Sequence, residues 1–170
     1  LDRVQGGDVV SPPYDVIDGA YQQALYDRHP NNVVRIIQGK EEAGDGEAVN
    51  RYTRAKVDYD VWKSSGIMVQ DETPSLYVYE QTFEIESHRG IVKKTRQGIV
   101  TLVEIEVLGE GQIYPHEHTM PGPKADRLAL MEHTEAAFGQ IFSLFSDPEG
   151  KVAALVEPQK ADTPLLEFGD

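Results

Sequence analysis

The stretch between residues 75 and 105 constrains the fold most, because its composition favours strands. It contains three runs enriched in β-branched and aromatic residues, and a charged turn at residues 86–90 separates the first run from the second. The runs cover residues 75–83, 90–94 and 98–105. Short connections between neighbouring runs are typical of antiparallel hairpins. The sequence therefore predicts an antiparallel sheet in the middle of the chain.

Helices are predicted on both sides of this sheet. In residues 47–64, four apolar or aromatic side chains recur at three- and four-residue spacing, which places them on one face of a helix. They are Tyr52, Ala55, Tyr59 and Trp62. Further helices are predicted over residues 20–28, 124–137 and 149–156, and further strands at residues 9–10, 33–37 and 141–145. The predicted fold class is α+β (mixed α/β), with a central, mostly antiparallel sheet and flanking helices.

The chain length bounds the domain organisation. A length of 170 residues supports one domain, or one domain with an appended subdomain. We expect residues 1–157 to form a single α+β domain and the polar residues 158–170 to form a loose connection. The first residue is Leu1 rather than Met, which suggests a fragment or a processed chain.

The composition narrows the partners. The net charge of −13, from 16 basic and 29 acidic residues, argues against broad nucleic-acid binding, which requires a basic face. Cysteine is absent, which excludes disulfides and thiolate metal sites and fits a cytoplasmic protein. No apolar run has the length of a membrane helix, so no membrane partner is expected. A small anionic ligand needs only a local basic cluster and stays compatible with this charge.

The segment that begins at His116 carries three titratable side chains in a row. His116, Glu117 and His118 do not have the helical spacing of zinc proteases. In an extended segment the two histidines would share one side, and a metal site would need a third ligand such as His133. We therefore expect no dedicated metal site. The interpretation we favour is that His116 and Glu117 act as catalytic groups that face a bound anion.

A predicted helix start follows directly. Pro123 suits the first helical position, where a missing amide donor has no cost. The unpaired amides of residues 124–126, reinforced by Lys124 and Arg127, would seat a phosphate or a carboxylate. The alternative is a surface turn in which Asp126 and Arg127 make ordinary helix contacts.

A second cluster lies near the start of the chain, at residues 11–16 (Ser-Pro-Pro-Tyr-Asp-Val). The two prolines stiffen the backbone, so Pro13, Tyr14 and Asp15 are presented from a non-helical segment, as binding loops require. The alternative is a connection in which Tyr14 fills the core and Asp15 or Asp18 caps the following helix.

Three motifs in order resemble a known family. They are residues 11–16, residues 71–81 (Asp-Glu-Thr-Pro-Ser-Leu-Tyr-Val-Tyr-Glu-Gln), and residues 116–119 together with 123–127 (Pro-Lys-Ala-Asp-Arg). This pattern is similar to the bacterial and archaeal family catalogued as domain of unknown function 1015. The resemblance implies that this chain is the amino-terminal part of a protein more than twice this length, whose second half carries an Asp-Gly-His-His-Arg motif. That motif is similar to the phosphate-binding signature of the ParB–sulfiredoxin superfamily, which includes free-serine kinases.

The resemblance and the anion-site chemistry together predict part of a nucleotide-dependent phosphotransferase, kinase-like, that acts on a small metabolite with ATP or ADP and Mg²⁺. The carboxy-terminal half of the same protein would complete the site, so we expect little activity from this chain alone. Two alternatives stay open: a regulatory module that senses a nucleotide or metabolite, and a structural subdomain. The predicted catalytic residues are Asp15, His116 and Glu117, and the predicted ligand-binding residues are Pro13, Tyr14, Thr119, Lys124, Asp126 and Arg127. We expect residues 13–15 to lie within side-chain reach of residues 116–119.

Overall fold

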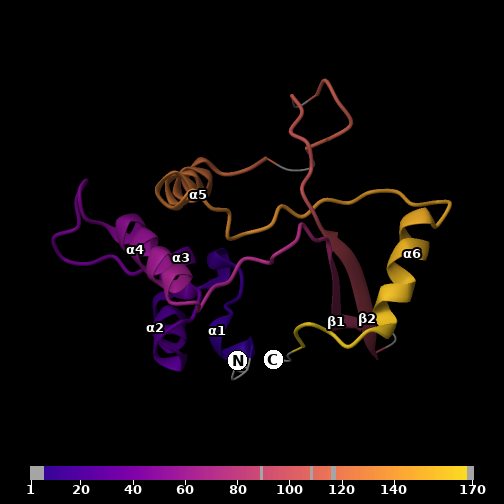
Figure 1. Cartoon of the computed structure of the whole chain (residues 1–170), viewed down its shortest axis with the longest axis horizontal. Coiled ribbons are helices and arrows are strands. Elements are labelled where there is room, and N and C mark those ends of the chain that lie inside the picture. The colour runs from indigo at the N-terminus through magenta and orange to yellow at the C-terminus, as the bar shows by residue number, and fades with distance from the viewer. Residues whose placement is uncertain (1–5, 89, 108, 116–117, 168–170) are drawn as a thin grey trace. The chain divides into compact units, whose positions relative to one another are not determined.

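The structure is a computed structural model that describes residues 6–88, 90–107, 109–115 and 118–167. The chain divides into two compact units, and Figure 1 traces the elements of both. Within the described residues, unit 1 comprises residues 6–70, 118–140 and 166–167, and unit 2 comprises residues 71–115 and 141–165. The α+β fold class is confirmed: helices accompany a two-stranded antiparallel sheet. That residues 1–157 form a single domain stays a prediction.

Unit 1 is helical. Its elements are α1 (Gly6–Val9), the 3₁₀ helix η1 (Tyr14–Val16), α2 (Gly19–Arg28), α3 (Val34–Ile37), α4 (Arg51–Ser64) and α5 (Pro121–Thr134). Local capping explains where the two middle helices begin. Asp18 accepts a hydrogen bond from the amide of Tyr21 at 2.7 Å at the start of α2, so Asp18 is the cap of the two that the alternative interpretation of residues 11–16 offered. Asn50 and Thr53 form a reciprocal capping box on α4, so this helix begins at residue 51 rather than at residue 47.

The core of unit 1 confirms the predicted helical face of α4. Ala55 and Trp62 are buried with Ile36 of α3 and Leu130 of α5, while Tyr52 and Tyr59 pack against this cluster. Burial of large apolar side chains contributes roughly 1.5–3 kcal/mol each. This stripe therefore fixes how α3, α4 and α5 pack together. A second cluster, formed by Ile17, Leu25 and Val34, joins α2 to α3.

Two short strands predicted from β-branched residues are helices instead. Residues 33–37 were expected as a strand, but residues 34–37 form α3. Residues 9–10 were expected to start a strand, but Val9 is the last residue of α1 and Val10 follows it. A short apolar run does not distinguish a buried strand from a buried helix. In this case Asn32 decides, because its buried side chain accepts from the amide of Val34 at 3.0 Å. It also donates to the carbonyls of Asp8 and Val10, both at 2.8 Å.

Unit 2 contains a hairpin and two short helices. The strands are β1 (Tyr77–Ser87) and β2 (Gly90–Val100), paired from Tyr77↔Val100 to Ser87↔Gly90. The helices are α6 (Lys151–Val156), which confirms the helix predicted there, and η2 (Glu157–Ala161), where a loose connection was expected. Gly90 has φ +102°, which suits the start of a strand after a tight turn.

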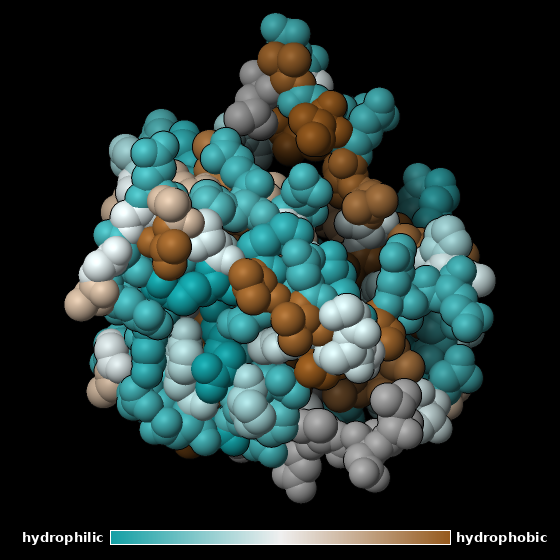
Figure 2. Space-filling model, turned by 60° about the vertical axis from the view of Figure 1, so that its left-hand side comes forward, coloured by the Kyte–Doolittle hydropathy of each residue, from teal (hydrophilic) through white to brown (hydrophobic). Residues whose placement is uncertain are grey.

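The sheet has fewer strands than predicted. The two runs expected at residues 90–94 and 98–105 form one strand that ends at Val100, and residues 141–145 pair with nothing in the described part of the chain. Their apolar side chains are exposed, with Leu102 at 99% and Ile141 at 92%. The face in Figure 2 likewise shows hydrophobic side chains (brown) at the surface among hydrophilic ones. Strand propensity alone does not hold these segments in a sheet, because strands require partners and a buried face.

Within the described part of the chain, the helices are too short or too polar to span a bilayer.

Candidate functional site

The start of α5 differs from the predicted anion seat. The helix begins at Pro121, two residues before the predicted first position, and Met120 precedes it without a side-chain cap. The amide of Lys124 therefore already bonds to the carbonyl of Met120 at 3.3 Å. Two of the first three helical residues are prolines, which have no amide donor. The expected row of unpaired amides at residues 124–126 is wrong, and any anion bound here depends on side chains.

Arg127 holds two elements of unit 1 together. Its Nη2 donates to the carbonyl of Ile37, at the end of α3, at 2.7 Å. Its Nε donates to the carboxylate of Asp126 at 2.9 Å, and Nη2 also contacts this carboxylate. The side chain is 26% exposed. Arg127 therefore has a structural role at the α3–α5 contact, and its outer edge is open to solvent.

Asp126 is the centre of a polar network between α4 and α5. The hydroxyl of Tyr52 donates to Asp126 at 2.6 Å, and Arg51 forms an ion pair with the same carboxylate. Burial raises the pKa of Asp126. Hydrogen bonds from Tyr52 and Arg127 outweigh that effect and leave the pKa below its ordinary value. Burial and the bond to Asp126 raise the pKa of Tyr52, so this phenol stays protonated near neutral pH. Asp126 is therefore an ionised anchor and a poor general base.

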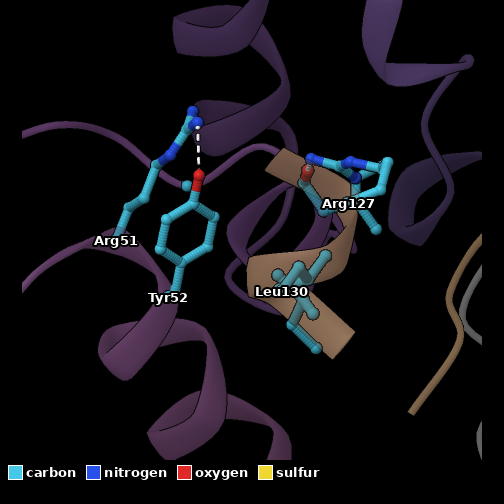
Figure 3. Close-up of a pocket in the computed structure, with 7 residues that line it drawn as sticks. Arg51, Tyr52, Arg127 and Leu130 are labelled. Atoms are coloured by element: carbon cyan, nitrogen blue, oxygen red, sulfur yellow. Dashed lines mark hydrogen bonds between the residues drawn. The ribbon is translucent and has the colours of Figure 1, made fainter. Parts of the chain in front are cut away.

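The network surrounds a narrow gap that is closed to a molecule the size of water. Figure 3 shows Arg51 and Tyr52 on α4, joined by a hydrogen bond of 2.9 Å, opposite Arg127 and Leu130 on α5. Gly39 also lines this gap, and a Cβ there would lie 3.1 Å from the carbonyl oxygen of Arg35. The side chains around the gap therefore hold the helices in place, and the gap itself does not hold a ligand. A ligand at this network would lie on its outer side.

The two motifs that the sequence singled out meet at the side chain of Arg127. The guanidinium carbon of Arg127 lies 4.0 Å from the centre of the Tyr14 ring, which is a cation–π contact. Tyr14 is half-buried in η1, while Pro13 and Asp15 are exposed. Asp15 forms no hydrogen bond or ion pair with a described residue. It is therefore available to accept a proton or to face a metal ion.

The remaining predicted residues divide into exposed ones and ones outside the described residues. Thr119 and Lys124 are exposed, and the ammonium group of Lys124 has no hydrogen-bond or ion-pair partner within the described part of the chain. His116 and Glu117 lie outside the described residues, so their expected reach to residues 13–15 stays a prediction. His133 is not placed as a free ligand, because its Nδ1 lies 2.7 Å from the carbonyl of Ala129 and its ring packs on Tyr52.

Arg51 was missed by the reasoning from sequence, and Tyr52 was assigned to the core alone. Tyr52 does pack against the core, but its hydroxyl reaches Asp126. A partial signal was present in the sequence. Arg51 and Tyr52 come directly after the Asn50 cap, so both lie in the first turn of α4. No spacing rule connects that turn to Asp126, which lies on another helix.

The comparisons with known proteins agree with the motif pattern. The family model described as "Protein of unknown function (DUF1015)" matches residues 3–170. The chain belongs to this family. Neither the curated proteins nor the solved structures include a match to the chain. A function for this DUF1015 chain is therefore inferred from its own residues.

Proposed function

We propose that this DUF1015 chain is the phosphate-binding part of a nucleotide-dependent phosphotransferase, kinase-like, that acts on a small hydroxyl-bearing metabolite. The observation that carries the proposal is the stacking of Arg127 on Tyr14. This contact joins two motifs that are far apart in sequence, each of which carries groups that phosphoryl transfer uses. Kinases supply cations for the phosphates and carboxylates for the proton or for Mg²⁺.

We assign those roles to residues of the two motifs. Lys124 and the outer edge of Arg127 supply positive charge, and the hydroxyl of Thr119 can donate to a phosphate oxygen. Asp15 supplies the free carboxylate, either as proton acceptor or as ligand of a Mg²⁺ that arrives with ATP or ADP. Asp126 orients Arg127 and takes no direct part. His116 and Glu117 are proposed as further catalytic groups on the basis of the motif alone.

A second candidate is a module that binds a nucleotide or metabolite without turnover. The engagement of Asp126 favours it, because the most buried carboxylate at the site is neutralised by two arginines and a tyrosine. Completion of the catalytic site by the carboxy-terminal half of the same protein, in the ParB–sulfiredoxin manner, is part of the first proposal. The two candidates differ only in turnover.

Titration calorimetry with ADP and ATP in the presence of Mg²⁺ tests the binding that both candidates share. We expect measurable binding to the chain and about tenfold weaker binding to Lys124→Gln, since a charge-assisted contact contributes roughly 1.5–3 kcal/mol. Lys151→Gln is the matched control, because Lys151 is exposed in unit 2 and pairs only with Glu149 among the described residues. Equal affinity of both variants would remove the proposed phosphate site.

Phosphorus NMR then separates the candidates. We expect the chain alone to convert ATP slowly or not at all with serine or a similar alcohol, and the protein extended by its second half to form a phosphate ester. A longer protein that binds ATP and forms no ester would leave the sensing module as the function.

A further inference from the structure

A second opening in unit 1 shares Gly39 and Arg51 with the narrow gap described above. It has a volume of about 250 Å³ and we refer to it as the α3–α4 hollow. Pockets for drug-sized ligands span roughly 300–1,000 Å³, so this volume suits a smaller metabolite. The hollow is lined by Tyr26, Arg35, Gly39, Lys40, Glu42, Arg51, Arg54, Val57 and Asp58.

Two of the four cations in the wall are already neutralised. Arg51 pairs with Asp126, and Arg54 forms a two-pronged ion pair with Asp45 at 2.6 and 2.8 Å. Hydrogen bonds from Arg54 lower the pKa of Asp45 to about 2. In each pair the arginine lines the hollow and the carboxylate lies outside its wall. These pairs leave little free charge for a ligand.

The other two cations have no such partner. Arg35 and Lys40 form no ion pair with a described carboxylate, and both lie against the ring of Tyr26, at 4.3 and 4.4 Å from its centre. Arg35 uses one donor on the carbonyl of Tyr26 at 3.0 Å, and its Nε is buried without a hydrogen-bond partner. Lys40 donates to Gln23 and retains further donors. Two like charges held beside one ring favour an anionic group between or above them.

One carboxylate in the wall is also unpaired. Asp58 follows Arg54 by one helical turn on α4, so the two side chains share a face. Asp58 is half-buried and makes no hydrogen bond or ion pair within the described part of the chain. Glu42 is the other carboxylate of the wall, but it is largely exposed and lies 3.7 Å from Arg54. The charge of Arg35 offsets only part of the cost of burying this carboxylate, so a cationic group of a ligand would stabilise it further.

We propose that the α3–α4 hollow binds a small zwitterion of the α-amino-acid class, with its anionic group against Arg35 and Lys40 and its ammonium group against Asp58. Such a ligand satisfies all three unpaired charges at once. A simple anion would leave Asp58 unpaired and would meet its repulsion. This site is separate from the nucleotide contact at Tyr14 and Arg127, and the proposal does not depend on that contact.

The test is a ¹H–¹⁵N chemical-shift titration of the chain with each of the standard α-amino acids up to about 10 mM. This concentration is high enough to detect binding with a Kd of about 1 mM. We expect at least one of them to cause saturable shifts at the amides of Gly39, Lys40 and Asp58. Its N-acetyl derivative and its decarboxylated amine, which each keep one charge, should bind at least about tenfold more weakly. No saturation with any amino acid, or equal binding of a one-charge analogue, would overturn the proposal.

Variants assign the site. Asp58→Asn and Arg35→Gln should each weaken the binding about tenfold or more, whereas Asp60→Asn should leave it unchanged. Asp60 is the matched control because it lies on the same helix but pairs with Lys56 and Lys63 outside the hollow. If Arg35→Gln does not fold, Lys40→Gln takes its place. Equal affinity of Asp58→Asn and Asp60→Asn for the amino acid would place this ligand elsewhere. Both variants should bind ADP with the same affinity, because the proposed nucleotide contact lies at Tyr14 and Arg127.

Discussion

Arg127 stacks on the ring of Tyr14 while it donates to the carbonyl of Ile37, and it thereby joins η1, α3 and the start of α5. A cation–π contact contributes about 0.5–1 kcal/mol at a site open to solvent. We expect Tyr14→Leu to lower the free energy of unfolding by about this amount and Tyr14→Phe, which keeps the ring, to change it little. Urea denaturation of both variants measures the difference. Equal losses would show that the hydroxyl, and not the stacking, stabilises this contact.

Arg127→Ala should be more severe than its surface position suggests. The change leaves the carbonyl of Ile37 and part of the Asp126 carboxylate without a donor, which costs about 2–3 kcal/mol. Lys124→Ala on the same helical turn is the control and should change stability by less than about 0.5 kcal/mol. Both are measured by urea denaturation. An Arg127→Ala protein as stable as Lys124→Ala would mean that Arg127 is a free surface side chain.

Those features of unit 1 that depend on local spacing could be predicted from the sequence, and those that depend on packing between helices could not. The helical spacing of Tyr52, Ala55, Tyr59 and Trp62 predicted a buried stripe correctly, because local periodicity determines which side chains share a face. The Asp18 cap, which the alternative interpretation of residues 11–16 offered together with Asp15, is likewise a local feature. The pairing of Arg51 with Asp126 was not predictable, because it depends on how α4 packs against α5. The strand predicted at residues 33–37 is wrong because Asn32 caps a helix there, and the strand predicted at residues 141–145 is wrong because no described strand pairs with it.

Asp126 should make stability depend on acid. Its pKa is lowered in the folded protein, so its contribution is complete above the ordinary pKa of about 3.9 and is lost as the pH falls through the lower folded value. Thermal melts of the wild type and Asp126→Asn should therefore differ by a constant amount from neutral pH down to about pH 4, and the difference should shrink below it. A difference that stays the same in strong acid would contradict the ionised network.

Asp58 should behave in the opposite way. Burial raises its pKa and the charge of Arg35 offsets only part of this effect, so the ionised form is less favourable in the folded protein than in the unfolded one. The stability that the protonated form gives is lost as the pH rises through the folded pKa. In the absence of ligand, Asp58→Asn should melt higher than the wild type at neutral pH, with the gap closing below about pH 4. A lower melting temperature at neutral pH would show that Asp58 has a stabilising partner.

The two units should differ in local stability. The strands β1 and β2 contain only exposed and half-buried residues, and two-stranded sheets are marginally stable in water. Helix α4 packs its buried face into the core of unit 1. Amide hydrogen exchange of this chain should therefore be slow for Ala55 and Trp62 and much faster for the hairpin. Equal protection of both would show that a partner covers the hairpin, for example a second copy of the chain.

Backbone shift mapping with Mg²⁺ and ADP tests the proposed function most directly, because it asks whether the two motifs form one site. We expect saturable shifts at the amides of Tyr14, Asp15, Thr119, Lys124 and Arg127, and all of them should give the same Kd for ADP. We expect no shifts in α6 or in the hairpin. The Lys124→Gln protein should show the same set of shifts at about tenfold higher ADP. Shifts confined to unit 2, or no saturable shift at Tyr14 and Arg127, would contradict a phosphate site at this contact.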